Sequence, residues 1–420
     1  DRAAVARAMT LPTKGSAQGP ALGPALVVIF AGVSAALHVG KLSPAIPVLR
    51  EALHISLLQA GFLLSLVQLA GMALGLAVGL AADGMGLKRS LITGLLVLFG
   101  AGALGGYARG ATDLLALRAL EGVGFLLVSM PAPSLIRHLV VPERMNTALG
   151  LWGAYMPFGA AMSLLCGPLF IATFSWQAWW WLLAVLSLIM AVWVWHVVPP
   201  DATRVYLQPA SWGARLSQTL TARGPWLVAL SFAMYSGQWL AVIGFLPSIY
   251  TQAGVSGGAM ALLTAGAAAV NMVGNIVSGR LLQRGVNPQG LLTLGFAAMA
   301  LGTVLAFATW PLNDGGSGVG LPPIVRYVAV LLFSAVGGVI PGTLFSLAVR
   351  MAPSEKTIST TVGWMQQWSA FGQFTGPPLV ALVASRVGGW QWTWAVTVAC
   401  SFAGIVLARR IGHTLRGSVT

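Results

Sequence analysis

Four ionisable side chains stand deep inside long apolar segments of the sequence, well away from their ends, and they occur as two pairs. His38 and Lys41 fall in the first long apolar run, and Arg118 and Glu121 fall in the fourth. The members of each pair are three residues apart, which places them on one face of a helix. Because an ionisable group is costly inside a bilayer, such residues are candidates for a solute, ion or proton pathway.

The four residue types favour anion binding and proton transfer. A guanidinium such as that of Arg118 can hold a carboxylate by two parallel hydrogen bonds, and Lys41 adds a mobile positive charge. Two permanent cations against one carboxylate leave a positive surplus, which attracts a small monoanion. Glu121 and His38 are the candidates for carrying a coupled proton. Structural roles stay open: an Arg118–Glu121 ion pair, Lys41 snorkelling to the interface, and hydrogen-bonded packing of His38.

Polar and aromatic residues in later apolar runs are candidates for the opposite wall of a binding site. They are Tyr235, Gln238, Trp239, Asn271, Asn275 and Gln366 in the second half, while Tyr155 and Trp152 in run five of the first half could also reach the cavity. Hydrogen bonding between helices is the stronger explanation for the Asn and Gln residues of runs eight and eleven. For the residues of run seven, a role in solute binding and a role in helix packing are equally good explanations.

The elements that carry these residues must be membrane helices. Of the 420 residues 57% are hydrophobic and 8% are charged, whereas soluble proteins are about 25% charged. This excludes soluble globular, disordered and disulfide-rich secreted proteins. The formal net charge of +14 comes from short basic clusters between apolar runs, so no nucleic-acid partner is expected. Cys166 and Cys400 lie inside apolar runs, and no metal or cofactor motif is present.

A helix needs ~20 mostly apolar residues to cross a bilayer. The sequence contains twelve such runs, at 22–46, 57–82, 90–108, 112–136, 146–171, 176–198, 225–250, 259–283, 289–311, 323–349, 357–384 and 390–411. We therefore predict an all-α polytopic membrane protein of twelve transmembrane helices arranged as two six-helix bundles.

Basic residues set the orientation, because they accumulate on the cytoplasmic side. Most of the 23 Lys and Arg residues fall on one side if both termini are cytoplasmic. The predicted organisation is a cytoplasmic tail at 1–21, bundles at 22–198 and 225–411, a cytoplasmic linker at 199–224 and a tail at 412–420. We expect a monomer in the inner (plasma) membrane, with the lipid bilayer as its surroundings.

The loop after the second run carries the most specific motif. The segment GLAADGMGLKR resembles the loop motif of the major facilitator superfamily, G-x-L-x-D-x-x-G-[RK]-[RK], with Asp83, Gly86, Lys88 and Arg89 at matching or near-matching positions. A degenerate copy, GRLLQRG, follows the eighth run, as expected of a transporter built from repeats. The resemblance implies that this loop gates the conformational change, while the positive-inside rule alone also explains its basic residues.

Two further segments extend the resemblance. RALEGVG in the fourth run is similar to the family pattern R-x-x-[QE]-G-x-G, and KLSPAIP followed by QAG is similar to cyanate permease-like anion carriers. In this superfamily spans 1, 4, 7 and 10 line a central cavity, which implies that the two ionisable pairs face each other there. The span-five element typical of proton-driven drug exporters is matched only loosely, by GAYMPFG.

These features predict a secondary active transporter that moves a small anionic solute by alternating access, driven by protons. The alternative is a proton-driven exporter of drugs or metabolites with the same fold. A channel would require a polar stripe along a pore, and the polar residues are isolated points. An enzyme would require a metal-ligand cluster or nucleotide-binding loop, and neither pattern is found.

Overall fold

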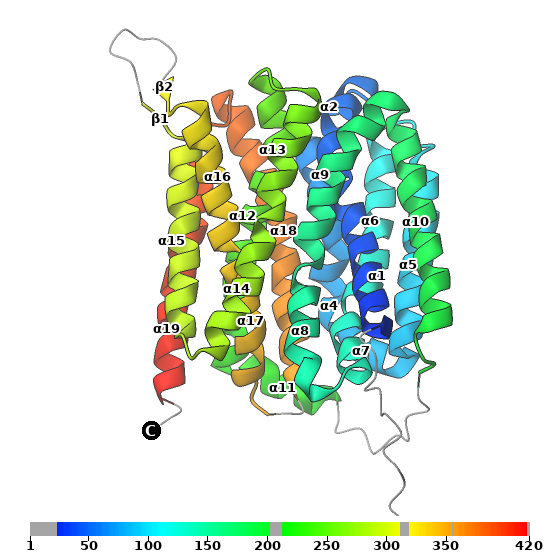
Figure 1. Ribbon diagram of the computed structural model, residues 1–420, viewed down its shortest axis with the longest axis vertical. Coiled ribbons are helices and arrows are strands. Elements are labelled where there is room, and N and C mark those ends of the chain that lie inside the picture. Colours follow the sequence, from blue (N-terminus) through cyan, green and yellow to red (C-terminus); the bar gives the residue numbers. More distant parts are fainter. Residues whose placement is uncertain (1–22, 202–211, 311–318, 355–356, 418–420) are drawn as a thin grey trace, which may run out of the picture.

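Long helices lying side by side make up nearly all of the structure (Figure 1). The computed structural model describes residues 23–201, 212–310, 319–354 and 357–417. The expected N-terminal tail therefore lies outside the described residues, as do residues 202–211 of the linker and the last three residues of the C-terminal tail. The two ends of the molecule are the hairpin end, at strands β1 (Thr309–Trp310) and β2 (Val319–Gly320), and the α11 end, at helix α11 (Trp212–Thr221).

Between Gly23 and the end of α10, the structure describes eleven helical segments. They are α1 (Gly23–Gly40), α2 (Leu42–Ala52), α3 (Leu57–Ser65), the 3-10 turn η1 (Leu66–Gln68), α4 (Leu69–Met85), α5 (Leu87–Gly105), α6 (Ala111–Ser129), α7 (Ala132–Leu139), α8 (Pro142–Gly153), α9 (Tyr155–Thr173) and α10 (Trp176–Val197).

The second half follows α11. Its helices are α12 (Arg223–Gln252), α13 (Gly257–Ala269), α14 (Asn271–Gln283), α15 (Pro288–Phe307), α16 (Pro323–Gly337), α17 (Val339–Arg350), α18 (Ile358–Val387) and α19 (Thr393–Gly417). The antiparallel β1–β2 pair joins α15 to α16, and neither this hairpin nor α11 was expected from the sequence.

Eleven stretches of the described residues are long and apolar enough to cross a membrane, and each coincides with an expected run. The one expected run without a counterpart among these eleven stretches is the run at 357–384. It forms α18, which is 30 residues long but carries Gln366, Gln367 and Gln373 among its apolar residues. The predicted membrane fold built from apolar helices is confirmed, while the count of twelve spans stays a prediction.

Several spans are interrupted partway, so that one apolar run becomes two helices. The break at Lys41 is followed by Pro44 and Pro47, which cannot donate main-chain hydrogen bonds. Pro131 separates α6 from α7, and Gly338 separates α16 from α17.

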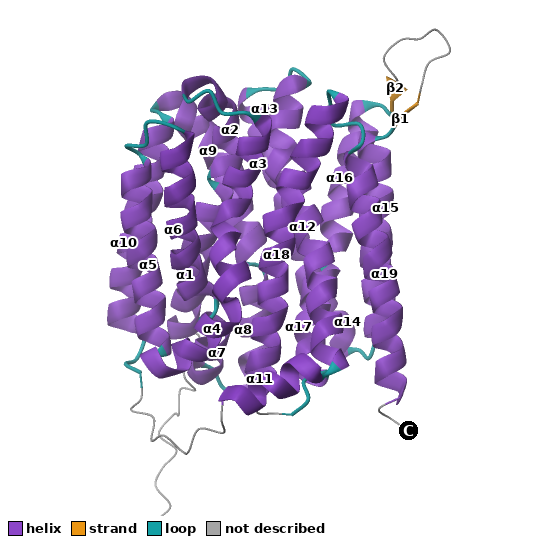
Figure 2. Ribbon diagram, turned by 180° about the vertical axis from the view of Figure 1, so that it is seen from behind, coloured by secondary structure: helices purple, strands orange, loops and turns teal. Residues whose placement is uncertain are grey.

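The two halves of the chain lie next to each other, with α1, α5, α6 and α10 on one side and α15, α16 and α19 on the other (Figures 1 and 2). They touch through α9 against α13, α2 against α12, and α3 and α4 against α18. Gly61 of α3 permits the last of these contacts, because a Cβ there would lie 3.2 Å from Pro378 Cα. The side chain of Gln367 on α18 also bonds the backbone of α4, accepting from Leu76 N and donating to Met72 O.

Candidate functional site

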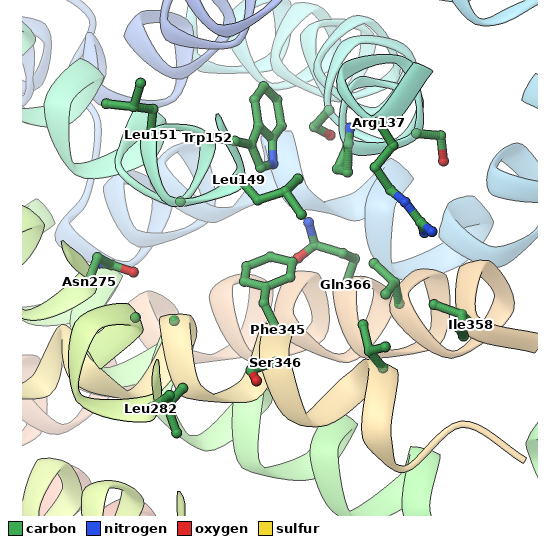
Figure 3. A pocket seen from close by; sticks show the side chains of 18 of the residues that line it. Arg137, Leu149, Leu151, Trp152, Asn275, Leu282, Phe345, Ser346, Ile358 and Gln366 are labelled. Atoms are coloured by element: carbon green, nitrogen blue, oxygen red, sulfur yellow. The ribbon is translucent and has the colours of Figure 1, made fainter. Parts of the chain in front are cut away.

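A cavity of about 810 Å³ lies between the two halves toward the α11 end. Its wall on the N-terminal side comes from the end of α6 and from α7 and α8. Its other wall comes from α14, α17 and the first turns of α18. Figure 3 shows side chains of both walls facing the same space. This volume lies within the usual range for small-molecule sites.

The cavity is electropositive. Arg137, Arg280 and Arg350 are among its lining residues, and all three side chains are exposed. No Asp or Glu occurs among the lining residues in the part of the chain that the structure describes. Converging positive charge at the mouth of a low-dielectric cleft raises the local concentration of anions.

Two buried polar atoms of the cavity wall lack a protein partner. Trp152 is 2% exposed and Asn275 is 5% exposed. Neither Trp152 Nε1 nor Asn275 Oδ1 has a hydrogen-bond partner among the described residues. Gln366 also lines the cavity, so two of the sequence candidates, Asn275 and Gln366, lie on its wall. Tyr155 is not a lining residue, and its ring stacks on that of Trp152 at 4.2 Å.

The structure brings the two ionisable pairs together into one cluster. Glu121 accepts from Lys41 Nζ at Oε1 and from Arg118 Nη1 at Oε2, the latter at 2.6 Å. His38 Nδ1 lies 3.3 Å from Lys41 Nζ and 3.5 Å from Glu121 Oε1. His38 Nε2 lies 2.9 Å from Ser187 Oγ on α10. The cluster therefore joins α1, α6 and α10 through contacts between side chains.

Helix breaks supply the remaining partners of the cluster. Arg118 Nη1 donates to His38 O, just before the break at Lys41, at 2.6 Å. Arg118 Nε donates to Leu63 O at 3.2 Å, close to the η1 turn that interrupts the second span. Lys41 O in turn accepts from Trp179 Nε1 at 3.2 Å, and Lys41 Nζ lies 4.7 Å from the Trp180 ring centroid.

The cluster is enclosed within the N-terminal half. His38 and Lys41 are 0% exposed, Arg118 and Glu121 are 1% exposed, and none of the four lines the cavity. The resemblance implied that they face the central cavity. In this conformation the helix faces that carry the two pairs are turned toward each other and toward α10, where His38 contacts Ser187. Their roles in solute binding and proton coupling stay predictions.

The candidates on α12 are held by hydrogen bonds within the C-terminal half. Tyr235 Oη lies 3.0 Å from Asn271 Nδ2, and Trp239 Nε1 donates to Ser334 Oγ at 3.2 Å. Gln238 accepts from Ser401 Oγ and donates to Met234 O. Tyr235, Gln238, Trp239 and Asn271 do not line the cavity. Their contacts are those of packing between helices.

The motif loop is held by a residue that sequence reasoning missed. Asp201, just after α10, accepts from the main-chain N–H groups of Lys88 and Arg89 at 2.9 and 3.2 Å, and so caps the N-terminus of α5. Lys88 Nζ donates to main-chain carbonyls at the end of α10, and Gly86 adopts a φ of 95° at the turn. These contacts join two elements of the same half. The side chain of Asp83 lies outside the described residues.

The cavity arginines were also missed as site residues. In the sequence Arg137, Arg280 and Arg350 read as topology markers, since each lies at or just beyond the end of an apolar run on the predicted cytoplasmic side. The signal that could identify them is their place in the last turns of α7, α14 and α17. Three helices that converge on one cavity deliver three charges to it.

Comparison with known proteins supports the fold and the family. The hexuronate transporter of Bacillus subtilis (strain 168) is 23% identical over 383 residues, which cover 86% of this chain and 88% of that protein. The cyanate transport protein CynX of Escherichia coli (strain K12) is 28% identical over 253 residues, covering 58% and 64%. The crystal structure of a variant of the E. coli fucose:proton symporter FucP superposes with a TM-score of 0.66 at 18% identity, covering 94% and 99%.

The family model of the Major Facilitator Superfamily matches residues 24–377, which span both halves and the cavity between them. The match includes the loop at Gly86–Arg89 and the ionisable cluster. The family resemblance predicted from the sequence motifs is therefore confirmed. The chain belongs to the Major Facilitator Superfamily and is a membrane transport protein rather than an enzyme.

Proposed function

We propose that the protein is a secondary active transporter that moves a small anionic solute by alternating access, coupled to protons. The observation that carries the proposal is the cavity between the halves, with three arginines and no carboxylate among its described lining residues. The names of two relatives support an anion, since hexuronate and cyanate are both anions. The name of the fucose:proton symporter supports proton coupling.

Under this proposal, the conformation described above is the one in which the cavity opens toward the cytoplasm. Contacts between the halves include Gly244 of α12, where a Cβ would lie 3.3 Å from Leu64, and the pairing of α9 with α13 toward the hairpin end. The cavity and its arginines lie toward the α11 end, which the positive-inside rule assigns to the cytoplasm of an inner-membrane protein. Transport then requires the halves to rock, closing the α11 end and opening the hairpin end.

Within this proposal the ionisable cluster carries the coupled proton. Glu121 holds two cations and lies beside His38, so a proton on Glu121 would release Lys41 and weaken the ties between α1 and α6. Such a change alters contacts inside the N-terminal half without touching the solute. Coupling would then act through the packing of α1, α6 and α10.

The test is anion uptake into proteoliposomes with and without an inward pH gradient. Arg137→Gln and Arg350→Gln should each raise KM by about tenfold, the loss of about 1.4 kcal/mol of binding. Arg386→Gln is the matched control, because Arg386 is exposed in the last turn of α18 and does not line the cavity. KM should also rise with ionic strength, since exposed charges are screened.

Two results would contradict the proposal. Uptake of the anion that both cavity variants leave unchanged would remove the arginines from the site. Flux that neither saturates nor responds to the pH gradient would indicate a channel and not a coupled carrier.

A further inference from the structure

The side-chain amide of Asn275 has a fixed orientation. Its Nδ2 lies 3.2 Å from Asn271 O and 3.0 Å from Asn271 Oδ1, and both of these atoms are acceptors. A flipped amide would place its own oxygen against two oxygens, so only one orientation is compatible with the contacts. Asn271 is fixed in turn, because its Nδ2 donates to Ser334 O at 2.8 Å. This relay leaves Asn275 Oδ1 as a buried acceptor with no partner among the described residues, on a side chain that lines the cavity.

The indole of Trp152 presents the opposite hydrogen-bonding character. Its Nε1 is a donor only, it is buried, and it has no partner among the described residues. The ring is held in place by stacking on Tyr155 at 4.2 Å with 17° between the planes. Gly32 of α1 leaves the room for it, because a Cβ there would overlap the ring. In Figure 3 the indole nitrogen faces the cavity.

The donor belongs to the N-terminal half and the acceptor to the C-terminal half, and the helices that carry them lie close together. Trp152 lies on α8, and a Cβ built on the next residue, Gly153, would lie 3.6 Å from Asn275 Oδ1 on α14. Figure 3 shows both side chains on the rim of one space, with the Gln366 amide across it. A solute that bonds both atoms would therefore bridge the two halves of the transporter.

We infer that the solute is an anion that also carries at least one hydroxyl donor, such as a hydroxylated carboxylate, and is not a bare inorganic or aliphatic anion. The charged group alone cannot satisfy Asn275 Oδ1, because that oxygen requires an O–H or N–H donor. A site built around buried polar atoms rejects an analogue that lacks the matching group, since those atoms are then left desolvated and unpaired. This inference rests on the proposed function and narrows its substrate class.

The experiment compares ligands of equal charge and similar shape. The purified full-length protein in detergent is titrated calorimetrically with glucuronate, galacturonate, cyclohexanecarboxylate and cyanate. At least one of the two hydroxylated acids should bind at least tenfold more tightly than cyclohexanecarboxylate or cyanate. Cyclohexanecarboxylate retains the six-membered ring and the carboxylate, so the difference reports the hydroxyl groups.

Variants locate the effect. Trp152→Phe removes the indole N–H and keeps a ring, and Asn275→Leu removes the acceptor at similar volume. Each should weaken binding of the hydroxylated acid about tenfold and leave cyclohexanecarboxylate within about twofold, which also shows that the variant is folded. Trp226→Phe is the control, because its indole N–H donates to Leu220 O outside the cavity.

The titrations distinguish a requirement for a hydroxyl group from anion transport itself. Equal binding of all four anions, or variants that weaken the hydroxylated and non-hydroxylated acids alike, would overturn the inference and leave the proposed anion transporter standing. Binding of none of the four anions would overturn both. If one variant does not fold, the ligand comparison on the unaltered protein and the other variant still decide.

Discussion

Removing the one carboxylate from the buried cluster should destabilise the protein far more than removing one of its cations. Glu121 is the common partner of Lys41 and Arg118, and all three side chains are at most 1% exposed. With Glu121 ionised the three permanent charges leave a net single positive charge. Glu121→Gln leaves two cations without a counterion, whereas Lys41→Met leaves a neutral Arg118–Glu121 pair.

The magnitude follows from the cost of an uncompensated buried charge. Breaking a buried ion pair by removing one partner costs ~3–5 kcal/mol, so Glu121→Gln should lower the free energy of unfolding by that amount. Lys41→Met replaces a buried chain of similar length by an apolar one, and the loss should stay below about 1.5 kcal/mol. Combining both substitutions should recover part of the loss, because one of the two unneutralised cations is removed.

The assay is equilibrium unfolding in dodecyl maltoside micelles titrated with SDS, followed by tryptophan fluorescence. Glu51→Gln is the control, since Glu51 is an exposed carboxylate at the end of α2 and its substitution should stay within about 0.5 kcal/mol. If Glu121→Gln costs no more than Lys41→Met, or if the double variant is the least stable, the cluster is not a closed electrostatic unit.

Two further predictions concern helix packing and capping. Gly372→Ala should lower the free energy of unfolding by ~1–3 kcal/mol, because a Cβ there would overlap the main-chain oxygen of Ala233 on α12. Gly363→Ala on the same helix is the control and should be neutral, since the atom nearest to its Cβ would be 3.7 Å away. A Gly372→Ala protein as stable as Gly363→Ala in the same SDS titration would contradict this. Asp201→Ala should lower the free energy of unfolding by ~1 kcal/mol, because it removes the cap on α5, and Asp201→Asn should lower it less. Equal losses of melting temperature for the two variants in a thermal-shift assay would argue against a charge effect at the helix terminus.

The sequence predicts the spans because a bilayer demands long apolar helices, and each apolar run is a local property. It does not predict the breaks, because a broken span keeps the same apolar composition. The run at 22–46 becomes two helices around Lys41, with α2 continuing to Ala52. The polar segment 199–224 contains α11, whose ten residues are too few to stand out as a helix in a polar background.

The arrangement of the candidate residues could be predicted only in part, because sequence spacing is also a local property. The i,i+3 spacing places His38 with Lys41 and Arg118 with Glu121, and the structure joins both pairs. Spacing fixes which residues share a face but not the direction that the face takes about the helix axis. Packing fixes that direction, and here it turns the pairs toward Ser187 on α10 and away from the cavity.

The separation of cluster and cavity has a mechanical consequence under the proposed function. The cluster ties α1, α6 and α10 to one another and also bonds Leu63 O at the break of the second span, so it joins four spans of the same half. The cavity wall is made instead by α7 and α8, which follow the break at Pro131 and precede the one at Ala154. A change of protonation at Glu121 would therefore alter the packing of the N-terminal half, to which α7 and α8 belong, and not the contacts of the solute. Coupling of this kind predicts that Lys41→Met alters the pH dependence of transport more than the affinity for the anion, whereas Arg137→Gln does the reverse.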